Sequence, residues 1–141
     1  VRMLNDRAGY SVACGADLDG VDADYTLDLA AADRPRLGRR DLVICREVLE
    51  HLTVVQIRRA VTTLCALASR YVYLTTRFHP APASLLDVAT RDDLDPTHIT
   101  MLHQDLLRVL FVLEGFRRCA AHEAAMDWQG LGRVLVYERV P

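Results

Sequence analysis

The stretch Asp41-Leu-Val-Ile-Cys-Arg-Glu-Val-Leu-Glu-His-Leu52 decides the fold that we expect for this chain. It begins with the apolar run 42–45, which is bounded by charged residues and is typical of a buried strand. From Arg46 to His51, polar side chains interleave with apolar ones at helical spacing, which predicts the start of a helix. Ligands bind outside the carboxyl ends of strands in open α/β sheets. The polar residues 46–51 are therefore the first candidate site.

The composition is that of a single globular domain over residues 1–141. Hydrophobic residues make up 51% of the chain and charged residues 26%, which is enough apolar surface for a core. The net charge of -2 argues against general nucleic-acid binding, and no apolar run is long enough to span a membrane. The four cysteines form no C-x-x-C pair, which favours free thiols in a cytoplasmic protein; they are Cys14, Cys45, Cys65 and Cys119.

Outward from this stretch, the sequence predicts strands that alternate with helices. The predicted strands are 10–15, 25–29, 42–45, 70–78, 117–125 and 131–140. The predicted helices are one that ends near Gly9, one over 53–69 with Thr53 as N-cap, and one over 100–114 that Gly115 closes. This alternation predicts an α/β fold with a mainly parallel sheet. The last two strands have no predicted helix between them, so we expect them to form an antiparallel hairpin at the sheet edge.

Several segments, in this order, resemble class I S-adenosylmethionine-dependent methyltransferases over nearly the whole chain. These segments are GADL (15–18), LDLA (27–30), DLVICREVLEHL (41–52) and HITMLHQDLLRVLFVLEGF (98–116). Two others, YLTTRF (73–78) and MDWQGLGRVLVYE (126–138), are similar to methyltransferase-like proteins of bacteriophage origin. The resemblance implies a Rossmann-like methyltransferase sheet and S-adenosylmethionine as cofactor.

Two acidic residues at predicted strand ends carry the cofactor contacts that the resemblance implies. Asp17 matches the position that takes the ribose hydroxyls, and Asp28 matches the position near the adenine amine. Their neighbours Leu18 and Leu29 are assigned to the same cofactor contacts. A carboxylate at the end of a strand can accept two hydrogen bonds from a vicinal diol. The alternative for Asp17 is that, together with Asp19, it only caps a turn.

The end of the central strand would line the methyl-transfer side of the cofactor. The resemblance assigns Cys45 and Arg46 to cofactor binding there. Glu47 and His51 are the candidate catalytic residues, each as a general base on a substrate hydroxyl. The alternative is that these residues brace the loop after the strand, as they do in many small-molecule methyltransferases.

The pattern E-x-x-E-H, formed by Glu47, Glu50 and His51, has a second interpretation as a metal site. Two carboxylates and an imidazole can chelate a divalent cation. The pattern resembles the magnesium or manganese motif of small-RNA 3′-terminal 2′-O-methyltransferases, which add a histidine downstream. His98 is the candidate for that histidine. We favour the metal-free interpretation and assign no metal ligand from the sequence.

One feature of the family has no counterpart in this sequence. The Gly-rich loop after the family's first strand is not matched, because Gly9, Gly15 and Gly20 are too scattered to form it. That first strand lies between the second and the fourth, so we expect two unpaired inner strand edges. Three explanations stay open. They are an N-terminal segment outside this sequence, re-pairing or strand exchange in a homodimer, and a degenerate relative that no longer binds the cofactor.

The function that we expect is methyl transfer from S-adenosylmethionine to an oxygen or nitrogen of an unidentified acceptor. The acceptor is a small molecule or a macromolecule, and residues 79–98, where the family usually builds the acceptor pocket, carry no recognisable code. The first alternative is a non-catalytic methyltransferase-like module that binds a partner. The second is a metal-dependent O-methyltransferase that uses the E-x-x-E-H site.

Overall fold

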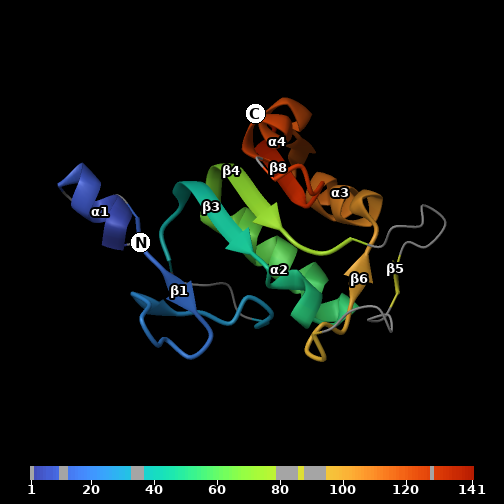
Figure 1. Ribbon diagram of the computed structural model, residues 1–141, viewed down its shortest axis with the longest axis horizontal. Coiled ribbons are helices and arrows are strands. Elements are labelled where there is room, and N and C mark those ends of the chain that lie inside the picture. The colour runs from blue at the N-terminus through green and yellow to red at the C-terminus, as the bar shows by residue number, and fades with distance from the viewer. Residues whose placement is uncertain (1, 10–12, 33–36, 79–85, 88–94, 128) are drawn as a thin grey trace.

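A four-stranded sheet forms the centre of the molecule. The computed structural model describes residues 2–9, 13–32, 37–78, 86–87, 95–127 and 129–141 (Figure 1). The sheet has the order β3-β4-β8-β7, with β3 (Arg40–Arg46), β4 (Ala68–Thr75), β8 (Val134–Arg139) and β7 (Phe116–Arg118). β3 and β4 are parallel, and β8 is antiparallel to both β4 and β7. Only β8 opposes the other three strands, which confirms the predicted mainly parallel sheet with a C-terminal antiparallel pair.

The remaining elements surround this sheet. The helices are α1 (Arg2–Ala8), α2 (Val54–Leu67), α3 (Gln104–Leu113) and α4 (Ala120–Met126), with a 3₁₀ turn η1 (Leu49–His51). Two small sheets pair β1 (Ala16–Asp17) with β2 (Tyr25–Thr26) and β5 (Leu86–Asp87) with β6 (Met101–Leu102). Among the described residues, no helix combines the length and the hydropathy needed to cross a membrane.

The core lies between the sheet and the helices α2 and α3. Alternate residues of the strands enter it because successive strand side chains point to opposite faces. The sheet contributes Cys45, Val72, Leu74, Leu135 and Tyr137, and the helices contribute Ile57, Val61, Leu64, Leu107 and Phe111. Phe111 stacks on Tyr137 with a centroid distance of 3.9 Å. Burial of each large apolar side chain contributes about 1.5–3 kcal/mol, so this contact helps to fix α3 on the sheet.

Local capping determines where the two long helices begin and end. Thr53 is the N-cap of α2: its hydroxyl accepts from the Gln56 N–H at 3.4 Å, and the Gln56 side chain accepts from the Thr53 N–H at 2.9 Å. This reciprocal pair confirms the predicted start. α3 starts at Gln104, four residues later than predicted, because residues 101–102 pair with β5. It ends before Gly115, whose φ of +78° favours glycine.

Three predicted strands are wrong in extent. The strand expected over 25–29 is limited to β2 (Tyr25–Thr26). The strand expected over 117–125 ends at Arg118, and α4 follows it, so β7 and β8 are antiparallel neighbours without forming a direct hairpin. The Ala-rich sequence of α4 favours a helix, and Glu123 ties that helix to the sheet by accepting from the Val136 N–H at 3.1 Å. The strand expected over 10–15 appears only as β1, while residues 10–12 lie outside the described part of the chain.

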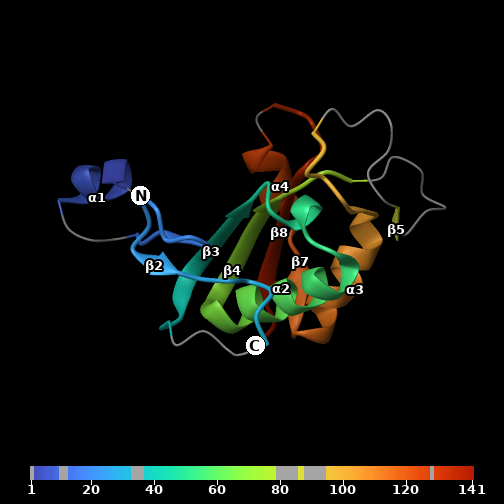
Figure 2. The ribbon, with the colours of Figure 1, turned by 90° about the horizontal axis from the view of Figure 1, so that it is seen from below.

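The expected gap in the sheet is present. β1 pairs with β2 in a separate two-stranded sheet, and β3 pairs only with β4 among the described residues. Figure 2 shows the β1–β2 pair on the β3 side of the four-stranded sheet. Leu42 and Ile44 on β3 are 42% and 56% exposed, although their strand is as apolar as a central one. Within the described residues, β1 and β3 each pair along one edge only, so the edges that face the gap carry unpaired backbone groups.

Candidate functional site

The carboxyl end of β3 turns sharply at Glu47. This residue has a φ of +49°, and its N–H donates to the carbonyl of Thr75 at 2.9 Å. The predicted helix start at 46–51 is wrong, because the left-handed residue breaks helical geometry and a 3₁₀ turn follows it. Glu47, Glu50 and His51 therefore do not share one face of an α-helix. A left-handed residue other than glycine costs about 1–3 kcal/mol, and such strain is concentrated at functional sites.

Glu50 is a buried carboxylate with one oxygen open. Its side chain is 1% exposed, and Oε2 accepts from the Thr76 hydroxyl at 2.8 Å. Its carbonyl accepts from the N–H groups of Ile99 and Thr100 at 2.9 and 3.2 Å. Oε1 has no hydrogen-bond partner within the described residues. Burial, and next the nearby Glu47 carboxyl, raise the pKa of Glu50. A buried carboxylate of this kind is costly unless it is protonated or meets a cation.

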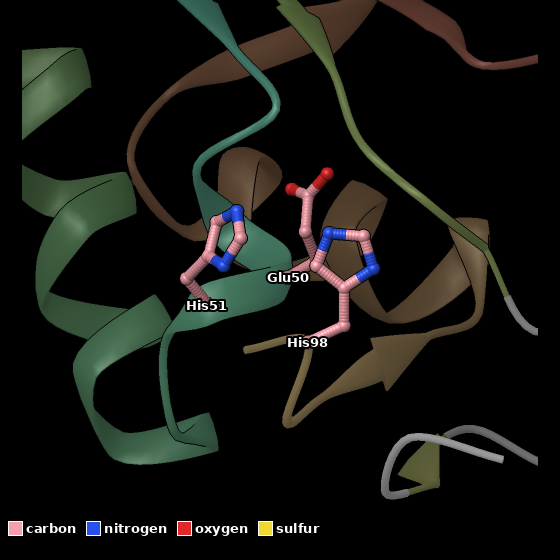
Figure 3. Close-up of side chains that lie close together, drawn as sticks. All are labelled: Glu50, His51 and His98. Carbon is pink, nitrogen blue, oxygen red and sulfur yellow. The ribbon is translucent and has the colours of Figure 1, made fainter. Parts of the chain in front are cut away.

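Two histidines face this carboxylate. Figure 3 shows Glu50, His51 and His98 directed toward one another, and their candidate ligand atoms all lie within 4.8 Å. The two imidazole rings are in edge contact, with centroids 4.8 Å apart. His98 is buried, whereas His51 is exposed at the surface. The structure thus brings together two members of the E-x-x-E-H pattern and the downstream histidine, and it leaves Glu47 outside this trio, which we call the Glu50 cluster.

Residues behind the histidines hold their rings in place. The Nδ1 atom of His51 lies 2.9 Å from the hydroxyl and 3.2 Å from the carbonyl of Thr97. The same hydroxyl donates to Asp95 at 2.6 Å, so Nδ1 of His51 is the donor to Thr97, and in the neutral ring Nε2 is the acceptor. Asp95 also lies 3.4 Å from Nε2 of His98. Hydrogen bonds from Thr97 lower the pKa of Asp95, which keeps this carboxylate charged.

This arrangement is the one that metal-binding histidines use, since a second partner usually fixes the ring and its tautomer. A lone pair on an imidazole is equally suited to general-base work. The sequence did not point to the supporting residues Thr76, Asp95 and Thr97, because they lie on other segments and follow no motif spacing. The one feature of the sequence that could have indicated Asp95 and Thr97 is that both lie within three residues of His98.

The predicted ribose and adenine residues lie on the β1–β2 pair. Asp17 is exposed at the end of β1, and within the described residues its carboxylate makes one hydrogen bond, from the Asp19 N–H at 3.5 Å. Asp28 accepts from the Ala30 N–H at 2.8 Å, which is the geometry of a turn cap. Leu18 is 68% exposed, whereas Leu29 packs against the core. Asp17 and Leu18 are thus open to a ligand, while Asp28 already has a local structural role.

The predicted residues at the end of β3 differ in accessibility. Arg46 is exposed, as a cofactor contact requires. Cys45 is 4% exposed and belongs to the core, and burial raises the pKa of its thiol to about 12. Its side chain therefore cannot reach a ligand, and only its backbone is available for the assigned contact.

This open sheet, with parallel β3 and β4 followed by the antiparallel strand β8 and then β7, belongs to a mixed α/β fold that is similar to the fold of class I S-adenosylmethionine-dependent methyltransferases. Among solved structures, the chain is similar to magnesium protoporphyrin IX methyltransferase (ChlM) from Synechocystis PCC 6803 with bound SAH. The TM-score is 0.54 and the identity 18%, over 82% of this chain and 51% of that chain. No protein-family model matches the chain, and no curated protein matches it in sequence.

Two further structures share the fold. CalS10, a SAM-bound amino pentose methyltransferase from Micromonospora echinaspora involved in calicheamicin biosynthesis, matches with a TM-score of 0.58 and 15% identity, over 82% of this chain and 64% of that one. The [4+2]-cyclase SpnF matches with a TM-score of 0.52 and 13% identity, over 96% of this chain and 60% of that chain. This chain spans less than two thirds of the length of each of the three proteins. At these identities the likeness establishes the fold.

Proposed function

We propose that this chain is part of an S-adenosylmethionine-dependent methyltransferase that acts on an oxygen or nitrogen. The observation that carries the proposal is the polar end of β3, where Arg46 is exposed, Glu47 is strained and the Glu50 cluster follows. In open α/β sheets this end of the strands is where ligands bind. The solved structures of this fold include methyltransferases with SAM or SAH bound, which supports the choice of cofactor.

The chain's own residues divide into two groups in this proposal. Asp17 holds the ribose hydroxyls, with Leu18 beside it, and Asp28 and Leu29 lie near the adenine. Arg46 and the backbone of Cys45 line the methyl-transfer side, and Glu47 or His51 accepts the proton of the acceptor. When bound, the cofactor supplies the electrophilic methyl group. The open carboxylate of Asp17 fits a diol better than Asp28 fits an amine, because Asp28 already accepts a backbone hydrogen bond.

Calorimetric titration of the full-length protein with S-adenosylhomocysteine tests the cofactor assignment. We expect saturable binding, and we expect Asp17→Asn to weaken it about tenfold, because a charge-assisted hydrogen bond contributes roughly 1.5–3 kcal/mol. Asp22→Asn is the control, since Asp22 is exposed and carries no role in the proposal. Absence of any binding would contradict the enzyme proposal and favour a non-catalytic binding module. The cyclase SpnF illustrates that this fold also occurs in a protein named for other chemistry.

A metal-dependent O-methyltransferase is the second candidate, and the Glu50 cluster favours it. The open oxygen of Glu50 and the two imidazoles offer three ligand atoms within 4.8 Å of one another. A site with two imidazoles and one carboxylate suits Mn²⁺, Fe²⁺ or Zn²⁺ better than Mg²⁺. A cation there would hold an acceptor hydroxyl and favour loss of its proton.

Titration with Mn²⁺, followed by electron paramagnetic resonance, tests this candidate. We expect one bound ion per chain and a loss of binding in His51→Asn, a variant that leaves the buried residues in place. His122→Asn is the matched control, because His122 is exposed on α4, where its ring contacts Tyr71, and it is not part of the Glu50 cluster. Methyl transfer that excess EDTA leaves unchanged would rule the metal-dependent mechanism out.

A further inference from the structure

A cavity of about 250 Å³ lies at the end of β4. Its lining residues are Arg77, Phe78, Met101, Leu131 and Arg133. They come from the segment that continues β4, from β6 and from the loop that precedes β8. A β-bridge between Phe78 and Leu102 joins the first two segments, and the pairing of Thr75 with Val134 joins the first and the third. Three parts of the chain that are distant in sequence therefore build one concave surface.

The loop before β8 fixes one of the two arginines. The carboxylate of Asp127 accepts from the N–H groups of Leu131 and Gly132 at 3.3 and 2.7 Å. The side chain of Gln104 donates to the Gly132 carbonyl at 3.3 Å. These contacts fix the backbone just before Arg133 and do not involve its guanidinium group. Arg133 is half-buried, and no acidic side chain pairs with it within the described part of the chain.

The lining combines two positive charges with three apolar side chains. The guanidinium of Arg133 offers a planar fork of donors that matches a phosphate or a carboxylate, and Arg77 adds a second positive charge to the lining. Phe78, Met101 and Leu131 offer apolar contact, and this mixture of apolar walls with few charged groups is typical of small-molecule sites. We propose that this cavity anchors the methyl acceptor, and that the acceptor carries an anionic group, phosphate or carboxylate, on an apolar or aromatic body.

The cavity and the Glu50 cluster are built on the same two segments. Thr76, which donates to the Glu50 carboxylate, directly precedes Arg77. Thr100, whose N–H donates to the Glu50 carbonyl, directly precedes Met101. An acceptor held by its anionic group would thus contact the same two segments that hold Glu50, the sequence neighbour of His51. The assignment of this cavity to the methyl acceptor rests on the proposed methyl transfer, whereas the prediction that the cavity binds an anion does not.

Calorimetry on the full-length protein tests the inference with three probes: phenyl phosphate, benzoate and neutral benzyl alcohol. We expect at least one anionic probe to bind about tenfold or more tightly than benzyl alcohol, which is the range of a charged hydrogen bond. The tighter anionic probe identifies the group as phosphate or carboxylate. Arg133→Gln should weaken that binding about tenfold, and Arg77→Gln should act in the same direction. Arg59→Gln is the control, because Arg59 is exposed on α2 and does not line the cavity.

S-adenosylhomocysteine titrations on the same variants separate this inference from the proposed function. Unchanged cofactor binding in Arg133→Gln would establish that the variant is folded. Cofactor binding without preference for an anionic probe, or an equal loss in Arg59→Gln, would overturn the inference alone. Anion binding at Arg133 without cofactor binding would overturn the methyltransferase proposal, and with it the assignment of this anion site to a methyl acceptor.

Discussion

Glu50 is a carboxylic acid whose ionisation the fold opposes. Its side chain is buried, one oxygen lacks a hydrogen bond within the described residues, and its pKa is raised by burial and then by Glu47. An acid with a raised folded pKa binds its proton more tightly in the folded state than in the unfolded state. Stability therefore falls as the pH rises above the unfolded pKa, and the loss is complete above the folded pKa.

Glu50→Gln tests this linkage in metal-free buffer with EDTA. The amide keeps the shape and the contact with Thr76 but cannot ionise, so we expect the variant to lose less stability than the wild type between pH 5 and pH 8. Urea unfolding at both pH values measures the difference. Equal pH dependence in the two proteins would contradict a raised pKa. Bound Mn²⁺ should reverse the effect, because the cation stabilises the ionised carboxylate of the wild type.

At this scale the sequence singled out three residues that the structure brings together, Glu50, His51 and His98, but it did not predict their geometry. The E-x-x-E-H pattern includes Glu50 and His51, and its resemblance to a metal motif with a downstream histidine suggested His98. They did not predict that Glu47 is left-handed, because that φ depends on a long-range contact with Thr75. The sequence did not predict that the Cys45 side chain is buried, because a cysteine in an apolar run can lie in the core or at an exposed strand end. The structure places Cys45 in the core.

The α2 helix is the element whose start rests on a single residue. The reciprocal hydrogen bonds of Thr53 and Gln56 satisfy two N–H groups that the helix itself leaves unpaired. We expect Thr53→Ala to cost about 1 kcal/mol, which lowers the melting temperature by roughly 4 °C in a domain of this size. Val55→Ala, an exposed change in the same turn, should cost less than about 0.5 kcal/mol. Equal melting temperatures of the two variants would contradict a stabilising cap.

Long elements with clear periodicity were predictable, and short ones were not. The predictions for α2, β3, β4, α3 and β8 hold because a run of many residues must bury one face against the core. The elements β1, β2 and β6 have two residues each, and their pairing depends on partners elsewhere in the chain. In α4, high helix propensity and the contacts of Glu123 outweigh the strand that was expected from residues 117–125.

The open edge of β3 affects the behaviour of the whole molecule. Unpaired strand edges with exposed apolar residues promote association, and Leu42 and Ile44 supply such residues here. We expect these 141 residues to form dimers or larger species at high concentration, and Ile44→Lys to shift them to monomers. Light scattering after size exclusion measures this. Val55→Lys is the matched control, since it places the same charge on an exposed apolar position of α2. A wild-type chain that is monomeric at all concentrations would contradict this expectation.

The break between β1 and β3 also divides the proposed cofactor site between two separate sheets. Asp17 belongs to the small sheet and Arg46 to the large one, and no described backbone hydrogen bond connects the two sheets. Whatever pairs with both edges would set the spacing between the ribose side and the methyl side of the site. A cofactor that contacts both Asp17 and Arg46 would also fix the spacing between the two sheets. Completing the sheet and binding the cofactor would then be thermodynamically coupled, each raising the affinity of the other.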